Sequence, residues 1–198
     1  ILTALSLGVQ HISAYHLTIE PDTTFGRRLR RGELSEVAEG QSEREYRLVE
    51  ELLTASGYEH YEVSNYALEG FRSRHNSSYW QGVEYLGIGS GAHSFNGDVR
   101  RWCQQPLPQY ITGRKYESET LSSTDRYNEY LMTSLRCAEG VDLQRIASQF
   151  GDSATTQLLS LAEPWIDSGK LLHEGDTLRI PTSEFLLSDS IISSLFEL

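Results

Sequence analysis

The stretch that decides the expected fold is His11-Ile12-Ser13-Ala14-Tyr15-His16-Leu17-Thr18-Ile19, which is rich in β-forming residues. Its apolar side chains fall on both faces, as in a strand that is covered on both sides. A helical pattern follows over about 39–56, and Tyr58 to Asn65 forms a second expected strand. A helix between two strands is the βαβ pattern of a parallel sheet. We therefore predict an α/β fold for this part of the chain.

The sequence changes character near Thr120. Three short helices, a hairpin and a closing helix are expected there, at about 122–135, 141–150, 155–168, 170–180 and 183–196. Three short helices followed by a hairpin are typical of a winged helix. We therefore predict two domains, the first over 1–119 and a small winged-helix-like α+β domain over 120–198.

The distribution of charge argues against a nucleic-acid partner. The formal net charge is -11, and the sequence from Thr120 onward contains five basic and twelve acidic residues. The third expected helix, over 155–168, contains no Lys or Arg. Because nucleic-acid binders gain affinity by neutralising phosphates, we expect no nucleic-acid partner. A DNA-binding winged-helix regulator is therefore disfavoured.

Several absences bound the class of protein. No apolar run approaches the roughly 18 residues of a membrane span, and no signal-peptide layout is found. We therefore expect a soluble, cytoplasmic protein without a membrane span. Cys103 and Cys137 are too few and too far apart for a disulfide framework or a zinc site, so both are expected to be reduced thiols. The segment from Ile1 to Gly8 has the pattern of a helix end without an opening cap, so we expect residues to precede Ile1.

His75 is the sharpest candidate for a functional residue. It lies in a polar segment that we expect to be a loop, with Tyr79 and Trp80 just behind it. Histidine is a common ligand of haem iron, and aromatic side chains pack well on a flat macrocycle. The alternative is structural: a loop histidine bonded to the backbone, with Trp80 filling the core.

Other candidates carry weaker signals. The run Gly87-Ile-Gly89-Ser-Gly91 matches neither the dinucleotide fingerprint nor a phosphate loop. Its glycines let a ligand or another strand approach the backbone closely. The arginines at 27–31 form an expected basic loop, which either receives acidic groups of a ligand or is simply solvated. Histidines in or beside the strands, such as His60, are expected to be structural.

Four motifs, taken in order, carry a family resemblance. They are HISAYHLTIEPDTTF (11–25), GYEHYEVSNYA (57–67), SRHNSSYW (73–80) and EYLGIGSGAHSF (84–95). Together they resemble the HemW-like radical-SAM family, which is related to oxygen-independent coproporphyrinogen III oxidase. The resemblance implies the C-terminal portion of a partial (β/α)6 radical-SAM barrel, followed by the winged-helix-like domain. The H-N-x-x-Y-W motif is its specific part, because it separates HemW-like proteins from the true oxidases.

The resemblance also implies cofactors. An intact protein of this family would carry a 4Fe–4S cluster, S-adenosyl-L-methionine (SAM) and haem. The sequence contains no C-x3-C-x2-C triad, so the cluster ligands are expected upstream of Ile1 and the chain alone should be inactive as an enzyme. Thr18, near the end of the expected last barrel strand, is the one candidate neighbour of SAM. Haem is the only cofactor that the chain itself is expected to keep.

The family motif places haem handling on His75, Asn76, Tyr79 and Trp80. The implied function is that of a haem chaperone, with haem or a porphyrin as ligand and a haem-accepting protein that the sequence does not identify. The alternative is a fragment of an oxygen-independent coproporphyrinogen III oxidase, an enzyme of porphyrin biosynthesis. Self-association through an exposed barrel edge is also expected.

Overall fold

The computed structural model describes residues 1–196, and only the backbone of Glu39. The chain forms two compact units. The first contains 1–73 and 181–187, and the second contains 74–180 and the described residues from 188 onward. These units are defined by packing, and the domain boundary at 119/120 stays a prediction.

The first unit is built on a three-stranded sheet with one long helix. Its elements are α1 (Leu2–Ser6), β1 (His11–Ser13), α2 (Thr24–Arg30), α3 (Glu39–Ala55), β2 (Glu59–Glu62), β3 (Asn65–Ala67) and the 3-10 helix η1 (Thr182–Leu187). The strand order is β1-β3-β2, and β3 is antiparallel to both of its neighbours. The outer strands therefore run in the same direction, as a βαβ unit requires, but β3 lies between them. The expected direct parallel pairing was wrong, because the short β2–β3 connection forms an antiparallel hairpin whose second strand lies between β2 and β1.

The predicted strand over 11–19 ends early. Regular pairing stops at Ser13, although the backbone N–H of Ala14 still donates to the Ser64 carbonyl at 2.8 Å. Tyr15 and Leu17 are 74% and 70% exposed, so the expected burial on both faces is absent in the described residues. The arginine-rich segment expected as a loop is mostly the helix α2, which is capped by Thr23.

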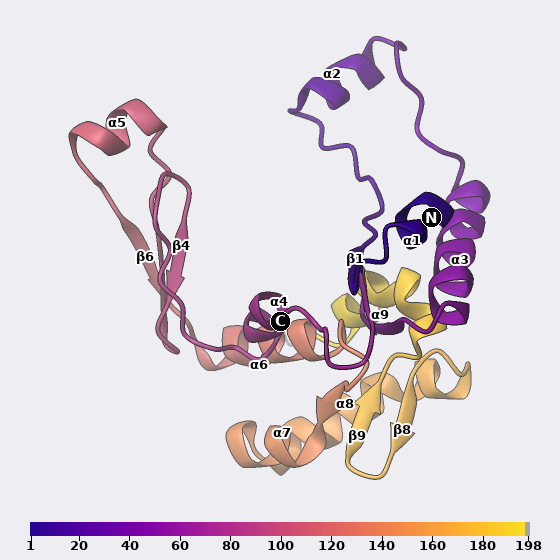
Figure 1. Cartoon of the computed structure of the whole chain (residues 1–198). Helices are drawn as coiled ribbons and strands as arrows, with labels where there is room; N and C mark the ends of the chain where they lie inside the picture. Colours follow the sequence, from indigo (N-terminus) through magenta and orange to yellow (C-terminus); the bar gives the residue numbers. More distant parts are fainter. Residues whose placement is uncertain (197–198) are drawn as a thin grey trace. The chain divides into compact units, whose positions relative to one another are not determined.

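The core of the first unit lies between α3 and the sheet. Leu53 of α3 is fully buried against Tyr58 and Tyr66, and partly buried Val49 packs beside them. The helix α3 contacts β2, and Figure 1 shows it as the long helix of this unit. The helix ends where predicted, because Gly57 adopts the positive φ of 86° that terminates a helix readily.

The second unit contains two antiparallel sheets and most of the short helices. Its elements are α4 (Arg74–Trp80), β4 (His93–Phe95), β5 (Val99–Trp102), α5 (Leu107–Thr112), β6 (Glu117–Thr120), α6 (Ser123–Ser134), β7 (Val141–Asp142), α7 (Leu143–Phe150), α8 (Asp152–Asp167), β8 (Leu172–Glu174), β9 (Thr177–Arg179) and α9 (Ser188–Ser194). The sheet orders are β4-β5-β6 and β7-β9-β8. Figure 1 shows β4 and β6 as an extended arm with α5 at its far end.

The helices predicted after Thr120 are confirmed as α6, α7 and α8, and the hairpin as β8 and β9. Ser122 and Asp125 form the capping box that begins α6. Leu131, Ile146 and Leu158, one from each helix, are fully buried in the core of this unit. The closing helix is instead divided into η1 and α9.

The coarse α/β assignment is confirmed, but the sheets are small and residues 1–196 contain no closed barrel. None of the helices in this described part is long and apolar enough to cross a membrane.

Candidate functional site

The HNSSYW motif forms the helix α4 and is not the loop that we predicted. The segment contains neither Gly nor Pro until Gly82, so nothing interrupts helical hydrogen bonding. The Ser78 hydroxyl donates to the Arg74 carbonyl at 2.7 Å, and Gly82 ends the segment with a φ of 67°. The helical spacing places His75 and Tyr79 on the same face.

Aromatic rings connect this helix to the adjoining strand. The exposed His75 ring meets the Tyr79 ring edge-on, with the ring centres 4.9 Å apart. Tyr79 in turn meets Tyr85 at 4.7 Å, and Tyr85 lies 6.1 Å from Phe95 of β4. This series of rings runs from the exposed histidine toward the sheet.

A cavity of about 590 Å³ lies beside the series, entirely within the second unit. Its size is within the usual range of small-molecule sites, about 300–1,000 Å³. Its aromatic lining consists of Tyr79, Trp80, Tyr85, Phe95, Tyr130 and Phe150. The structure thus brings Tyr79 and Trp80 of the predicted set to the cavity, whereas His75 and Asn76 lie outside its lining.

The cavity also carries charged side chains. These are Asp98, Arg100, Arg126, Glu129 and Arg145. Arg100 pairs with Glu129 at 2.7 Å, and Arg126 pairs with Asp98 at 2.9 Å. Burial disfavours the charge of Arg100, but hydrogen bonds with Glu129 and Tyr85 outweigh it, so the pKa of Arg100 lies above its ordinary value. Three cations and two carboxylates give the lining a positive balance in an acidic chain.

Trp80 contributes an unsatisfied donor. Its indole N–H is buried, and residues 1–196 offer it no hydrogen-bond acceptor. A buried donor without a partner costs free energy, so it favours a ligand that supplies an acceptor.

The glycine-rich run has a structural explanation. A Cβ on Gly87 would lie 2.0 Å from the His93 carbonyl oxygen, so only glycine permits this approach to β4. The Gly87 N–H also donates to the Ser94 hydroxyl at 3.0 Å. The close approach of another strand is therefore observed at Gly87, whereas Gly89 and Gly91 adopt positive φ with no atom within 4 Å of an added Cβ.

The residues present do not fit an iron–sulfur cluster. Cys103 is buried and Cys137 is partly buried, and neither is joined in a disulfide. The described part of the chain contains no group of three or more side chains suited to holding a metal ion. Thr18 is exposed and lies beyond the end of β1, and its contact with SAM stays a prediction.

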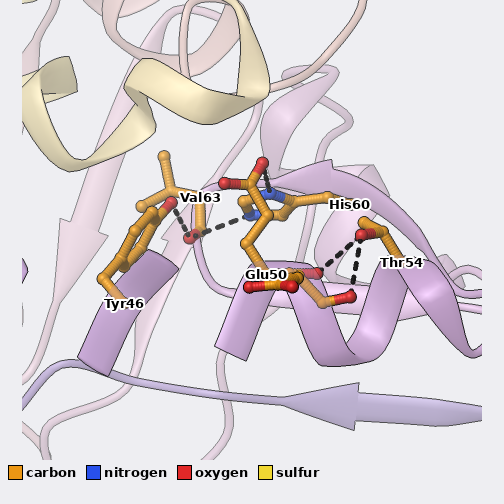
Figure 2. A network of polar contacts seen from close by, with 6 residues as sticks. Tyr46, Glu50, Thr54, His60 and Val63 are labelled. Carbon is orange, nitrogen blue, oxygen red and sulfur yellow. Dashed lines mark hydrogen bonds and ion pairs between the residues drawn. The ribbon is translucent and has the colours of Figure 1, made fainter. Parts of the chain in front are cut away.

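A separate polar cluster lies in the first unit (Figure 2). His60 is only 4% exposed and stacks on Tyr66 with ring centres 4.1 Å apart. Its Nδ1 lies 3.3 Å from a carboxylate oxygen of Glu50, and the Val63 carbonyl lies near both its Nε2 and the Tyr46 hydroxyl. Burial lowers the pKa of His60 despite the opposing effect of Glu50. This strand histidine is thus held by structural contacts, as expected.

Sequence reasoning missed the cationic side of the cavity. Arg126, Tyr130 and Thr133 recur at helical spacing along one face of α6, and all three line the cavity. This polar stripe, next to the buried face of the helix, could have been recognised in the sequence as a possible site lining. Arg145, on the next helix, gave no comparable signal.

Comparisons with known proteins identify relatives over most of the chain. Residues 121–187 match the HemN C-terminal domain. The heme chaperone HemW of Bacillus subtilis is 32% identical over 181 residues, which cover 88% of this chain and 48% of that protein. HemW of Mycobacterium tuberculosis strain H37Rv is also 32% identical, over 97% of this chain and 49% of that protein. The chain therefore spans about half the length of these relatives.

A solved structure shares the fold. The radical-SAM enzyme coproporphyrinogen III oxidase (HemN) from Escherichia coli matches 98% of this chain and 50% of its own, with a TM-score of 0.75. The sequence identity is 18%, so this likeness concerns the fold alone.

Proposed function

Because this chain is HemW-like over most of its length, we propose that it binds haem as part of a haem chaperone. The ligand would occupy the cavity of the second unit, with Tyr79 and Trp80 packed against the macrocycle. His75 and Asn76, one turn earlier on α4, would lie at its edge, and His75 is the candidate iron ligand.

The cavity lining is the observation that carries this proposal. A tetrapyrrole is flat and largely apolar, and its carboxylates are confined to one edge. Six aromatic side chains suit its faces, and the net positive charge of the lining suits its acidic groups. The helix that bears the HNSSYW motif supplies two of these aromatic side chains directly.

The finer architecture and the other cofactors are part of the same proposal. We take residues 1–119 as the C-terminal part of a partial (β/α)6 barrel with its sheet extension, and 120–198 as a winged-helix-like domain. The order of α6 to β9 and the fold of the solved relative support this. A 4Fe–4S cluster would require ligands outside this chain, and SAM would require further residues besides Thr18. Without such ligands, the residues of this chain would be inactive as an enzyme.

The oxidase alternative has less support. Its favourable observation is the structural likeness to HemN, which at 18% identity concerns the fold only. The curated relatives at 32% identity are named as haem chaperones.

As part of the haem-chaperone proposal, we place the protein in the cytoplasm, where it would deliver haem to an acceptor protein. Exposed Tyr15 and Leu17 would provide a surface for self-association.

The test is a titration of the chain with ferric haem, followed by the Soret band. We expect wild type to shift the band. His75→Ala should change the band and weaken binding by about tenfold or more, since even outer-shell partners of metal ligands are worth that much. His75 is exposed, so the substitution should not disturb folding.

His173→Ala is the matched control, because His173 is also exposed but does not line the cavity. It should behave as wild type. Absence of a Soret shift in wild type would refute haem binding, and an identical shift in His75→Ala would refute only the ligand assignment.

A further inference from the structure

The charged side chains of the cavity are not equivalent. Arg100 and Arg126 are already paired with carboxylates of this chain, Glu129 and Asp98. Arg145 is different: among residues 1–196 no carboxylate lies within ion-pair distance of its guanidinium group. It is therefore the cation of the lining that remains available to an external anion.

Arg145 is nevertheless held in place. Its guanidinium lies over the Tyr130 ring, 4.3 Å from the ring centre, and its Nε donates to the Gln149 side chain at 3.4 Å. Tyr130 and Gln149 also line the cavity. Stacking on an aromatic ring restricts the planar fork of an arginine and so reduces the entropy lost when it binds a carboxylate.

Different elements supply aromatic rings and the available cation of the lining. Tyr79, Trp80 and Phe95 come from α4 and β4, whereas Arg145 comes from α7. A ligand that satisfies both groups must combine a flat apolar body with an acidic group. We infer that Arg145, held by Tyr130 and Gln149, binds a carboxylate of the tetrapyrrole and so orients it in the cavity. This inference rests on the proposed function and adds the contact that recognises the ligand's acidic edge.

The experiment uses metal-free protoporphyrin IX, which removes iron ligation from the measurement, and its dimethyl ester, which lacks the charges. Binding to the whole chain is followed by porphyrin fluorescence. Arg145→Gln should weaken binding of the acid by about three- to tenfold, the range expected for one charge-assisted contact of an exposed arginine. Binding of the ester should be unaffected, and Arg145→Lys should retain part of the affinity for the acid.

Arg179→Gln is the matched control, since Arg179 pairs with Glu174 on the β8–β9 hairpin and does not line the cavity. It should bind both porphyrins as wild type does. The inference is overturned if Arg145→Gln binds the acid as wild type does, if it loses acid and ester equally, or if wild type binds neither. A normal haem titration combined with any of these results would leave the proposed function standing.

Discussion

Replacing Phe185 by Ala is expected to lower the free energy of unfolding by about 3–5 kcal/mol, the usual cost of removing a buried phenylalanine. Phe185 is 1% exposed, and its ring packs edge-on against His60 with ring centres 5.1 Å apart. The substitution would leave a void beside a buried histidine whose neighbours are already close-packed. Urea unfolding followed by circular dichroism measures the loss.

Leu186→Ala is the matched control because Leu186 is the next residue and is 39% exposed. Its cost should be below about 1.5 kcal/mol, since less buried area is lost than at Phe185. Equal losses for the two variants would contradict the packing of η1 against His60.

Gly140→Ala is expected to destabilise the chain by about 2–4 kcal/mol, because strain and steric overlap add together. Gly140 has a φ of 76°, a backbone conformation that residues other than glycine adopt at a cost. An added Cβ would also lie 2.4 Å from the Leu178 carbonyl oxygen and 2.5 Å from the Arg179 Cβ. The β7–β9 pairing would have to shift to make room. Thermal unfolding of the purified variant measures the loss.

Gly169→Ala separates the backbone strain from the steric overlap. Gly169 has a similar φ of 71°, but an added Cβ would meet nothing within 4 Å. Its cost should stay near the roughly 1–2 kcal/mol of backbone conformation alone. A Gly140→Ala variant no less stable than Gly169→Ala would contradict the close approach to β9.

Local signals in the sequence predicted the elements after Thr120 well. The capping box of Ser122 and Asp125, the glycine that ends α7 and the turn at Gly175 act over a few residues, so they can be read without knowledge of the tertiary fold. The pairing of β1 was not predictable in this way. It depends on β3, more than fifty residues later, which inserts between β1 and β2.

The candidate site shows the same division. The HNSSYW motif directed attention to Tyr79 and Trp80, but its polar composition suggested a loop where the unbroken backbone hydrogen bonding gives a helix. Arg145 could not be associated with the motif, because α4 and α7 are separated by more than sixty residues and only packing brings them to the same cavity.

The location of haem is the central claim, and amide hydrogen exchange with and without ferric haem tests it most directly. We predict slower exchange on haem binding over 79–85, 126–133 and 145–150, with no change over 59–67 in the first unit. Protection that spares these three segments and appears instead over the arginine-rich helix α2 would contradict the account.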